Sequence, residues 1–205
     1  MERIGLLGAG HLARFLVDGF LRAGVPPEGL AVTRRGQGEA IGKARGVAVC
    51  EDAEALARAA PIILLSVRPM DAAATLGEAG VGPHHTVISV CAGVPLDRLA
   101  TVAPKATLVR AMPISAASLG ASPTPLFPDN QIAHTVLSQL GPVIPVEGEA
   151  ELQAASASAA VYGLIHDLIG ATADDLARAG VHGEGARRLA ADTFAAAAAM
   201  VNASP

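Results

Sequence analysis

Short apolar runs and apolar residues at helical spacing follow one another from the start of the chain. Residues 4–7 form an apolar run, and a glycine-containing break follows at 8–10. Apolar residues then recur at helical spacing, at Leu12, Phe15, Leu16 and Phe20. This pattern predicts a strand, a tight turn and a helix within residues 4–20.

Similar runs continue to about residue 146. They predict strands at residues 29–33, 47–50, 61–67, 86–90, 107–112 and 143–146, and helices at 51–59 and 129–140, the second with Asp129 near its cap. The run at 61–67 is apolar throughout, which is typical of a central strand covered on both faces. The segment 123–125, Pro-Thr-Pro, is interpreted as part of a connection.

This alternation predicts an α/β fold with a Rossmann-type, doubly wound sheet, whose ligands lie at the carboxyl ends of the strands. Five loops follow predicted strands or the first glycine break. We expect them to line one crevice, at residues 8–13, 33–36, 66–71, 90–95 and 112–116.

The pattern changes after residue 147. Residues 149–203 contain no proline and are rich in alanine, which predicts helices at 151–169, 171–179 and 184–201, broken near Gly170 and at 180–185. We therefore predict a dinucleotide-binding domain at residues 1–147 and an all-helical domain at 148–205. Because residues 194–201 are apolar nearly all round, we expect the helical domain to dock against its counterpart in a homodimer.

Composition narrows the possible partners. The net charge is −4 and Lys and Arg do not cluster, which argues against a nucleic-acid partner. The apolar runs are too short or too interrupted to cross a bilayer and no signal segment precedes the first strand, so we expect a cytoplasmic protein without a membrane partner. Cys50 and Cys91 lack metal-ligand spacing, and His84 and His85 are interpreted as loop surface, so no metal site is predicted.

The first glycine break carries a recognisable motif. Gly8, Gly10 and Ala13 fit the pattern G-x-G-x-x-A between a strand and a helix. Gly8 permits the tight turn, and Gly10 leaves the amides of the helix N-terminus open to a pyrophosphate. The predicted cofactor residues at this turn are Gly8, Ala9, Gly10, His11 and Leu12.

The end of the second predicted strand indicates which dinucleotide binds. An acidic residue there would bind the ribose 2′-hydroxyl of NAD, but this chain has Thr33, Arg34 and Arg35. Arginine pairs with a 2′-phosphate, so the pattern favours NADP(H). The alternative is that both arginines are merely solvated loop residues.

Four motifs in series resemble those of the pyrroline-5-carboxylate reductase family. They are GAGHLA at residues 8–13, SVRPMD at 66–71, ISVCAGVPLDRL at 88–99 and VRAMPISAASLGAS at 109–122. The resemblance covers nearly the whole chain. It implies NAD(P)H bound in an N-terminal Rossmann domain, and substrate placed against a dimerising helical domain. It also implies cofactor contacts from the second and third motifs, at Ser66, Val67, Arg68, Pro69, Ala92 and Gly93.

The chain departs from the family pattern where substrate is expected. Ile114 and Ser115 stand where the family has Asn and Thr, and residues 156–162 read SASAAVY where it has S-G-S-G-P-A-Y. Replacing those glycines and the proline favours a continuous helix without free backbone amides for a substrate carboxylate. The chain also ends before a family S-P-G-G-T-T segment. We therefore expect a substrate that is not necessarily pyrroline-5-carboxylate.

Three residues of the first C-terminal helix are the candidate catalytic residues: Ser156, Tyr162 and His166. Tyr162 and His166 are four residues apart and share a helix face, where they could act as a donor pair. The alternative is that Tyr162 and His166 only form structural hydrogen bonds with each other or with the backbone, and that Ser156 is only a small packing residue. The helical part contains no lysine, which argues against a β-hydroxyacid dehydrogenase.

Two functional hypotheses follow. The first is an NADPH-dependent reductase that transfers hydride to the C=N bond of a small cyclic imine or imino acid. The alternative is a non-catalytic, dimeric NADP(H)-binding sensor or accessory protein. Both predict NADP(H) binding, and they differ on whether small imines cause oxidation of bound NADPH.

Overall fold

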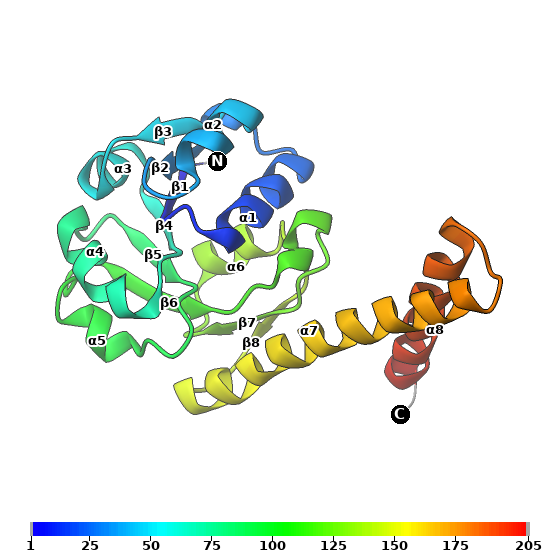
Figure 1. The fold of residues 1–205 in the computed structure, drawn as a ribbon. Helices are drawn as coiled ribbons and strands as arrows, with labels where there is room; N and C mark the ends of the chain where they lie inside the picture. The colour runs from blue at the N-terminus through cyan, green and yellow to red at the C-terminus, as the bar shows by residue number, and fades with distance from the viewer. Residues whose placement is uncertain (1, 204–205) are drawn as a thin grey trace. The chain divides into compact units, whose positions relative to one another are not determined.

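The computed structural model describes residues 2–203 (Figure 1). The chain divides into two compact units, Met1–Ser156 and Ala157–Pro205. Helix α7 (Glu149–Arg178) is continuous and runs from the first unit into the second. Each unit is therefore described separately.

The first unit is built on one eight-stranded sheet. Its strands are β1 (Ile4–Leu7), β2 (Leu30–Thr33), β3 (Ala48–Cys50), β4 (Ile62–Leu65), β5 (Thr86–Ser89), β6 (Thr107–Ala111), β7 (Thr124–Phe127) and β8 (Val143–Pro145). Their order is β3-β2-β1-β4-β5-β6-β7-β8, and all neighbours are parallel except β6 and β7. The predicted doubly wound α/β fold is confirmed.

Helices cover both faces of this sheet (Figure 1). One face packs against α1 (His11–Arg22), α2 (Gly38–Arg45), η3 (Ser115–Leu119) and α6 (Gln131–Leu137). The other face packs against α3 (Ala53–Ala59), α4 (Ala72–Ala79) and α5 (Leu96–Ala100). In β4, Ile62 and Leu64 enter the first core while Ile63 and Leu65 enter the second. The prediction of a central strand covered on both faces is therefore confirmed.

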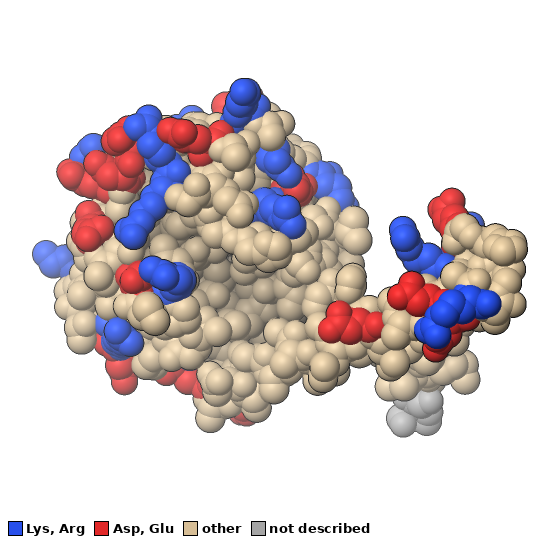
Figure 2. All heavy atoms as spheres, viewed as in Figure 1, with Lys and Arg blue, Asp and Glu red and all other residues tan. Residues whose placement is uncertain are grey.

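Two short 3-10 turns, η1 (Pro27–Gly29) and η2 (Pro69–Asp71), complete the elements of this unit. Charged side chains of both signs are intermixed on its surface near α2 and α3, and uncharged surface occupies the middle of the face drawn in Figure 2. Arg58 and Glu54 of α3 form one of the ion pairs in that region.

Several sequence predictions for this unit are wrong. Residues 123–125 are not a simple connection, because Thr124 begins strand β7 and is fully buried. The predicted position of Asp129 near the cap of α6 is correct: the cap is the next residue, Asn130, whose side chain accepts a hydrogen bond from Ala133 N at 3.0 Å. Helices α2 and α4 were missed, because Gly and Ala make up half or more of each helix and leave a weak apolar pattern.

His85 is buried and does not lie on the loop surface as the sequence suggested. Its Nδ1 accepts a hydrogen bond from Gly82 N at 2.9 Å, so the proton is on Nε2, which donates to Ala57 O at 3.0 Å. The imidazole thus joins α3 to the loop before β5.

The second unit contains the rest of α7, a turn at residues 179–183, and α8 (Glu184–Ala203). The predicted break between these helices is confirmed, with Gly180 and Gly183 at positive φ. The predicted break at Gly170 is wrong. A single glycine costs a helix about 1 kcal/mol, which the long helix around it tolerates.

An apolar stripe on α7 remains exposed. Val161, Leu164, Ile165 and Leu168 are 51%, 68%, 42% and 53% exposed, and their spacing places them on one helix face. Within residues 2–203, no helix is both long and apolar enough to cross a membrane.

Candidate functional site

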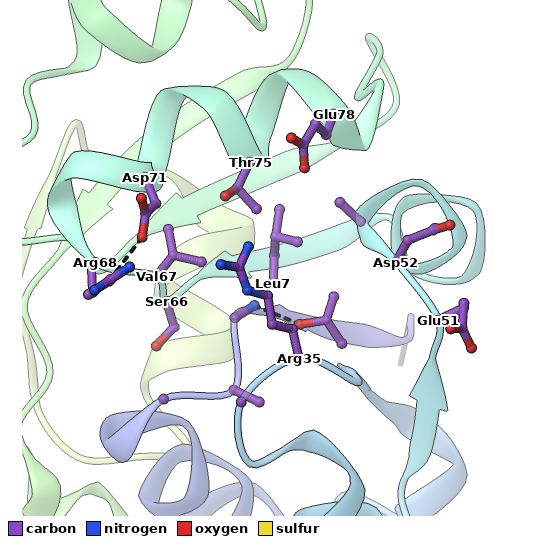
Figure 3. A pocket seen from close by; sticks show the side chains of 16 residues that line it. Leu7, Arg35, Glu51, Asp52, Ser66, Val67, Arg68, Asp71, Thr75 and Glu78 are labelled. Atoms are coloured by element: carbon purple, nitrogen blue, oxygen red, sulfur yellow. Dashed lines mark hydrogen bonds and ion pairs between the residues drawn. The ribbon is translucent and has the colours of Figure 1, made fainter.

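A cavity of about 320 Å³ opens at the carboxyl ends of β1, β2 and β4 (Figure 3). Strand β1 lies between β2 and β4, so this is where the strand order reverses and where doubly wound sheets bind ligands. The lining residues are Leu7, Gly8, Ala9, Gly10, Thr33, Arg35, Gly36, Glu51, Asp52, Ala53, Ser66, Val67, Arg68, Asp71, Thr75 and Glu78.

The glycine turn between β1 and α1 forms the floor of this cavity. Gly8 has φ +103°, and a Cβ there would lie 2.5 Å from Ser66 O, so only glycine fits. Its amide donates to Thr33 Oγ1 at 3.0 Å, which ties the turn to the end of β2. A Cβ on Gly10 would meet only Ser66 O, at 3.9 Å, so this position is open toward the cavity.

Helix α1 begins at this open position. Its N-cap is Gly10, which supplies no side-chain cap, and its first turn contains no acidic residue. The first amides of α1 are therefore left for an external acceptor, and the helix dipole favours an anion there. This arrangement fits a pyrophosphate.

The two arginines at the end of β2 have different surroundings. Arg34 forms ion pairs with Glu39 and Glu51. The Arg35 side chain extends into the cavity (Figure 3) and forms no ion pair within residues 2–203. Of the two, Arg35 is the cation available to an anionic ligand.

Two of the acidic residues that line the cavity near the end of β3, Glu51 and Asp52, are engaged with other groups. Glu51 pairs with Arg34, and Asp52 is the N-cap of α3, where its Oδ1 accepts from Ala55 N at 2.7 Å. Because these carboxylates already have partners, they oppose an anion beside Arg35 less than free carboxylates would.

The loop after β4 forms the opposite wall. Arg68 Nε donates to Asp71 Oδ2 at 3.0 Å (Figure 3). The Cys91 thiol supports this loop from behind by donating to Leu65 O and Val67 O, both at 3.3 Å. Burial raises the pKa of the Cys91 thiol, outweighing the hydrogen bond to Val67 that lowers it. Cys91 therefore stays a protonated, structural thiol at neutral pH.

The cavity contains most of the predicted cofactor residues. Gly8, Ala9, Gly10, Thr33, Arg35, Ser66, Val67 and Arg68 line it, whereas His11, Leu12, Arg34, Pro69, Ala92 and Gly93 do not. Likewise, the loops at 90–95 and 112–116 contribute none of its lining residues. Cofactor contacts from these positions stay predictions.

Sequence reasoning missed part of the lining. Glu51 and Asp52 follow β3, so the rule that ligands lie at the carboxyl ends of strands could have found them. Thr75 and Glu78 lie on α4, which the sequence pattern did not reveal.

The candidate catalytic residues all lie on α7. Ser156 Oγ donates to Leu152 O at 2.7 Å, the usual bond of a serine to the preceding helical turn. Tyr162 is partly buried and His166 is exposed. Residues 156–162 belong to an uninterrupted helix, which confirms the prediction made from their alanines. Their backbone amides therefore donate hydrogen bonds to carbonyl oxygens of the preceding turn of α7.

No group of three or more His, Cys, Asp or Glu side chains within residues 2–203 is arranged to hold a metal ion.

A glycine turn, an open helix N-terminus and an arginine without an ion-pair partner among residues 2–203 lie together where the strand order reverses, and they define a dinucleotide-binding α/β protein. Comparison with known proteins makes this more specific. A family model described as "NADP oxidoreductase coenzyme F420-dependent" matches residues 3–93.

Relatives match over the whole chain. A pyrroline-5-carboxylate reductase from Mycobacterium leprae is 30% identical, and the match covers 98% of this chain and 74% of that protein. The structure of a pyrroline-5-carboxylate reductase from Coxiella burnetii superposes with a TM-score of 0.82 at 25% identity, covering 99% of this chain and 80% of that one. The NADP-bound pyrroline carboxylate reductase of Plasmodium falciparum has the same fold, with a TM-score of 0.82 at 20% identity over 99% and 79% of the two chains. The chain belongs to the pyrroline-5-carboxylate reductase family.

Proposed function

We propose that this protein is an NADPH-dependent reductase that transfers hydride to the C=N bond of a small cyclic imine or imino acid. The observation that carries the proposal is the cavity with Gly8, Gly10 and Arg35, which has no ion-pair partner in the described part of the chain, in a member of the pyrroline-5-carboxylate reductase family. NADPH, when bound, supplies the hydride.

The cofactor would be held by two features of the first unit. The open amides at the start of α1, beside Gly10, would bind the pyrophosphate. Arg35 would pair with the 2′-phosphate, while Arg34 is occupied by Glu39 and Glu51. Thr33 would hold the turn in place through Gly8 N.

The chemistry demands little from side chains. A protonated imine already carries the positive charge that attracts hydride, so the protein must mainly orient the substrate and exclude water. Ser156, Tyr162 and His166 stay our candidates for substrate contact, with the two larger side chains as hydrogen-bond donors.

The substrate need not carry a carboxylate. Because residues 156–162 form an uninterrupted helix, their amides are not available to bind one. We propose that the substrate range includes cyclic imines without a carboxylate, beside pyrroline-5-carboxylate itself.

We further propose that the protein is a homodimer assembled through the exposed stripe of α7. Val161, Leu164, Ile165 and Leu168 form a contiguous apolar face on one helix, and faces of this kind mark association surfaces. Further apolar side chains of this unit are exposed on α8, at Leu189, Met200 and Val201.

The same uninterrupted helix favours the second candidate, a dimeric NADP(H)-binding sensor or accessory protein, because a polar substrate finds few free donors on it. The two candidates predict the same cofactor cavity. They differ only in turnover.

The test is NADPH consumption, followed by absorbance, with a panel of cyclic imines with and without a carboxylate. We expect consumption that depends on both enzyme and imine, and that is lost in the cofactor-site variant Gly10→Val. Tight NADPH binding with no consumption across the panel would favour the binding protein. Absence of NADPH binding would refute both candidates.

A further inference from the structure

An ion pair between a buried arginine and a partly buried glutamate lies outside the cofactor cavity. Arg110 of β6 is 3% exposed, and its Nη1 donates to Glu149 Oε1 at 3.0 Å. Its Nε and Nη2 are also buried and have no hydrogen-bond partner within residues 2–203. The guanidinium therefore depends on Glu149 for compensation of its charge.

Glu149 joins three elements at one carboxylate oxygen. Besides the bond from Arg110, Oε1 accepts from Leu96 N at 2.9 Å. Leu96 is the first residue of α5, whose N-cap Pro95 provides no side-chain cap. Glu149 is itself the first residue of α7. One carboxylate thus connects β6, α5 and α7 across 39 and 53 positions of sequence.

This junction fixes one end of the loop at residues 91–95. Cys91 holds the other end, because its thiol donates to Val67 O of the cavity wall. Ser89 of β5 is the register partner of Arg110, so the loop leaves the sheet directly beside the buried guanidinium. The loop is therefore tied at one end to the cavity wall and at the other to the start of α7.

We propose that Arg110 and Glu149 are a positioning pair for the reductase reaction. The pair holds the loop at 91–95 against the first turn of α7. The wall of the cofactor cavity and the helix that carries Ser156 are therefore connected through one rigid junction. The proposal rests on the proposed function. Neither residue lines the cavity, so the pair acts through the loop and the helix and not by touching the cofactor.

An ionic pair suits this role for a physical reason. Separating it would leave an uncompensated charge in the core, so partly open arrangements are strongly disfavoured. A pair that only stabilised the fold could be replaced by apolar residues without functional loss. That difference makes the proposal testable.

The central variant is Glu149→Gln, which keeps an acceptor for Leu96 N but removes the charge. The matched control is Asp18→Asn, which neutralises a carboxylate of similar exposure, 35% against 32%, in the Arg45–Asp18 pair joining α1 and α2. Each protein is assayed for NADPH affinity, for kcat with the most active imine, and for hydrogen exchange of peptides covering 91–100 and 149–156.

We expect Glu149→Gln to lower kcat at least tenfold, to change the Kd for NADPH less than twofold, and to accelerate exchange in both peptides. The control should change neither kcat nor that exchange by more than twofold. An unchanged kcat with unchanged exchange would overturn the proposal, and so would losses of kcat and NADPH affinity that are equal.

If Glu149→Gln does not fold, the apolar double variant Arg110→Met/Glu149→Leu replaces it. A folded double variant with low kcat and normal NADPH affinity supports positioning. One with full kcat, or one that also fails to fold, overturns it, because the pair would then serve folding alone. Inactive wild-type protein would refute the proposed function, and the exchange data would still test the coupling of the loop to α7.

Discussion

Arg34 and Arg35 are adjacent in sequence but have different roles in the structure. Arg34 is neutralised by Glu39 and Glu51, whereas Arg35 extends into the cavity without an ion-pair partner in the described part of the chain. Sequence alone could not separate them, because Glu39 and Glu51 approach Arg34 only after α2 and β3 have folded around β2. We therefore propose that selectivity for NADPH depends on Arg35.

We expect Arg35→Ser to weaken NADPH binding roughly 10- to 100-fold, because the variant loses the binding free energy of a charge-assisted hydrogen bond. NADH binding should remain nearly unchanged. Arg34→Ser is the matched variant and should have a clearly smaller effect on NADPH. Fluorescence titration of both variants with both cofactors measures this. Equal losses from the two substitutions would refute the assignment.

Cys91 gives a prediction about pH at the residue scale. Because burial raises the pKa of this thiol in the folded protein, its stabilising contribution is fully present below the ordinary thiol pKa of about 8.5. That contribution is lost as pH rises through the higher folded pKa, at up to about 1.4 kcal/mol for each pH unit.

Urea unfolding between pH 7 and pH 10 measures this loss. We expect Cys91→Ala to remove part of the alkaline decline in the free energy of unfolding. Cys50→Ala is the control for the partly buried second thiol, whose pKa is also raised by burial. An identical alkaline decline in wild type and Cys91→Ala would show that the Cys91 thiol does not contribute.

At the scale of elements, the two glycines of the turn between β1 and α1 are needed for different reasons. A side chain at Gly8 would collide with Ser66 O and would adopt an unfavourable φ, whereas a Cβ at Gly10 would make only an ordinary contact with Ser66 O at 3.9 Å. We expect Gly8→Ala to lower the free energy of unfolding by about 2–4 kcal/mol. Gly10→Ala should leave stability within about 1 kcal/mol of wild type but reduce NADPH affinity, because its methyl group enters the pyrophosphate position.

Thermal unfolding and NADPH titration of the two alanine variants distinguish these effects. A Gly10→Ala protein that binds NADPH as tightly as wild type would contradict the placement of the pyrophosphate.

Elements with strong apolar patterns could be predicted from sequence, and elements built by tertiary contacts could not. The strands β1, β4 and β5 were found because both of their faces are buried, which requires continuous apolar runs. Strand β7 was missed because Pro125 suggested a connection, but the strand fits as the antiparallel partner of β6. Gly170 was read as a helix break because a local propensity was given more weight than the helix around it.

The same distinction applies to the candidate site. The glycine turn and the end of β2 are local motifs, so their residues could be named from the sequence. Thr75 and Glu78 enter the cavity from a helix with a weak pattern, and the contact of Arg110 with Glu149 joins residues 39 positions apart. Such contacts depend on the strand order, which local sequence does not specify.

At the scale of the whole molecule, assembly is the main open prediction. The exposed stripe of α7 consists of Val161, Leu164, Ile165 and Leu168. We expect Leu164→Glu/Leu168→Glu to dissociate a dimer, because burying two carboxylates in an apolar interface is strongly unfavourable. Leu119→Glu, at a 75% exposed position in the first unit, is the control and should leave assembly unchanged.

Sedimentation velocity over a range of concentrations measures this. A wild-type protein that sediments as a monomer at all concentrations, or a double variant that remains dimeric, would contradict the proposed interface.

The central claim is hydride transfer from NADPH to an imine carbon, and isotope transfer tests it most directly. The protein is incubated with a cyclic imine and NADPH carrying deuterium at the transferable position, and the amine product is examined by mass spectrometry. We predict one deuterium in each product molecule, at the former imine carbon, and none with the Gly10→Val variant. An amine without deuterium, or oxidation of the cofactor without formation of amine, would contradict the proposed reaction.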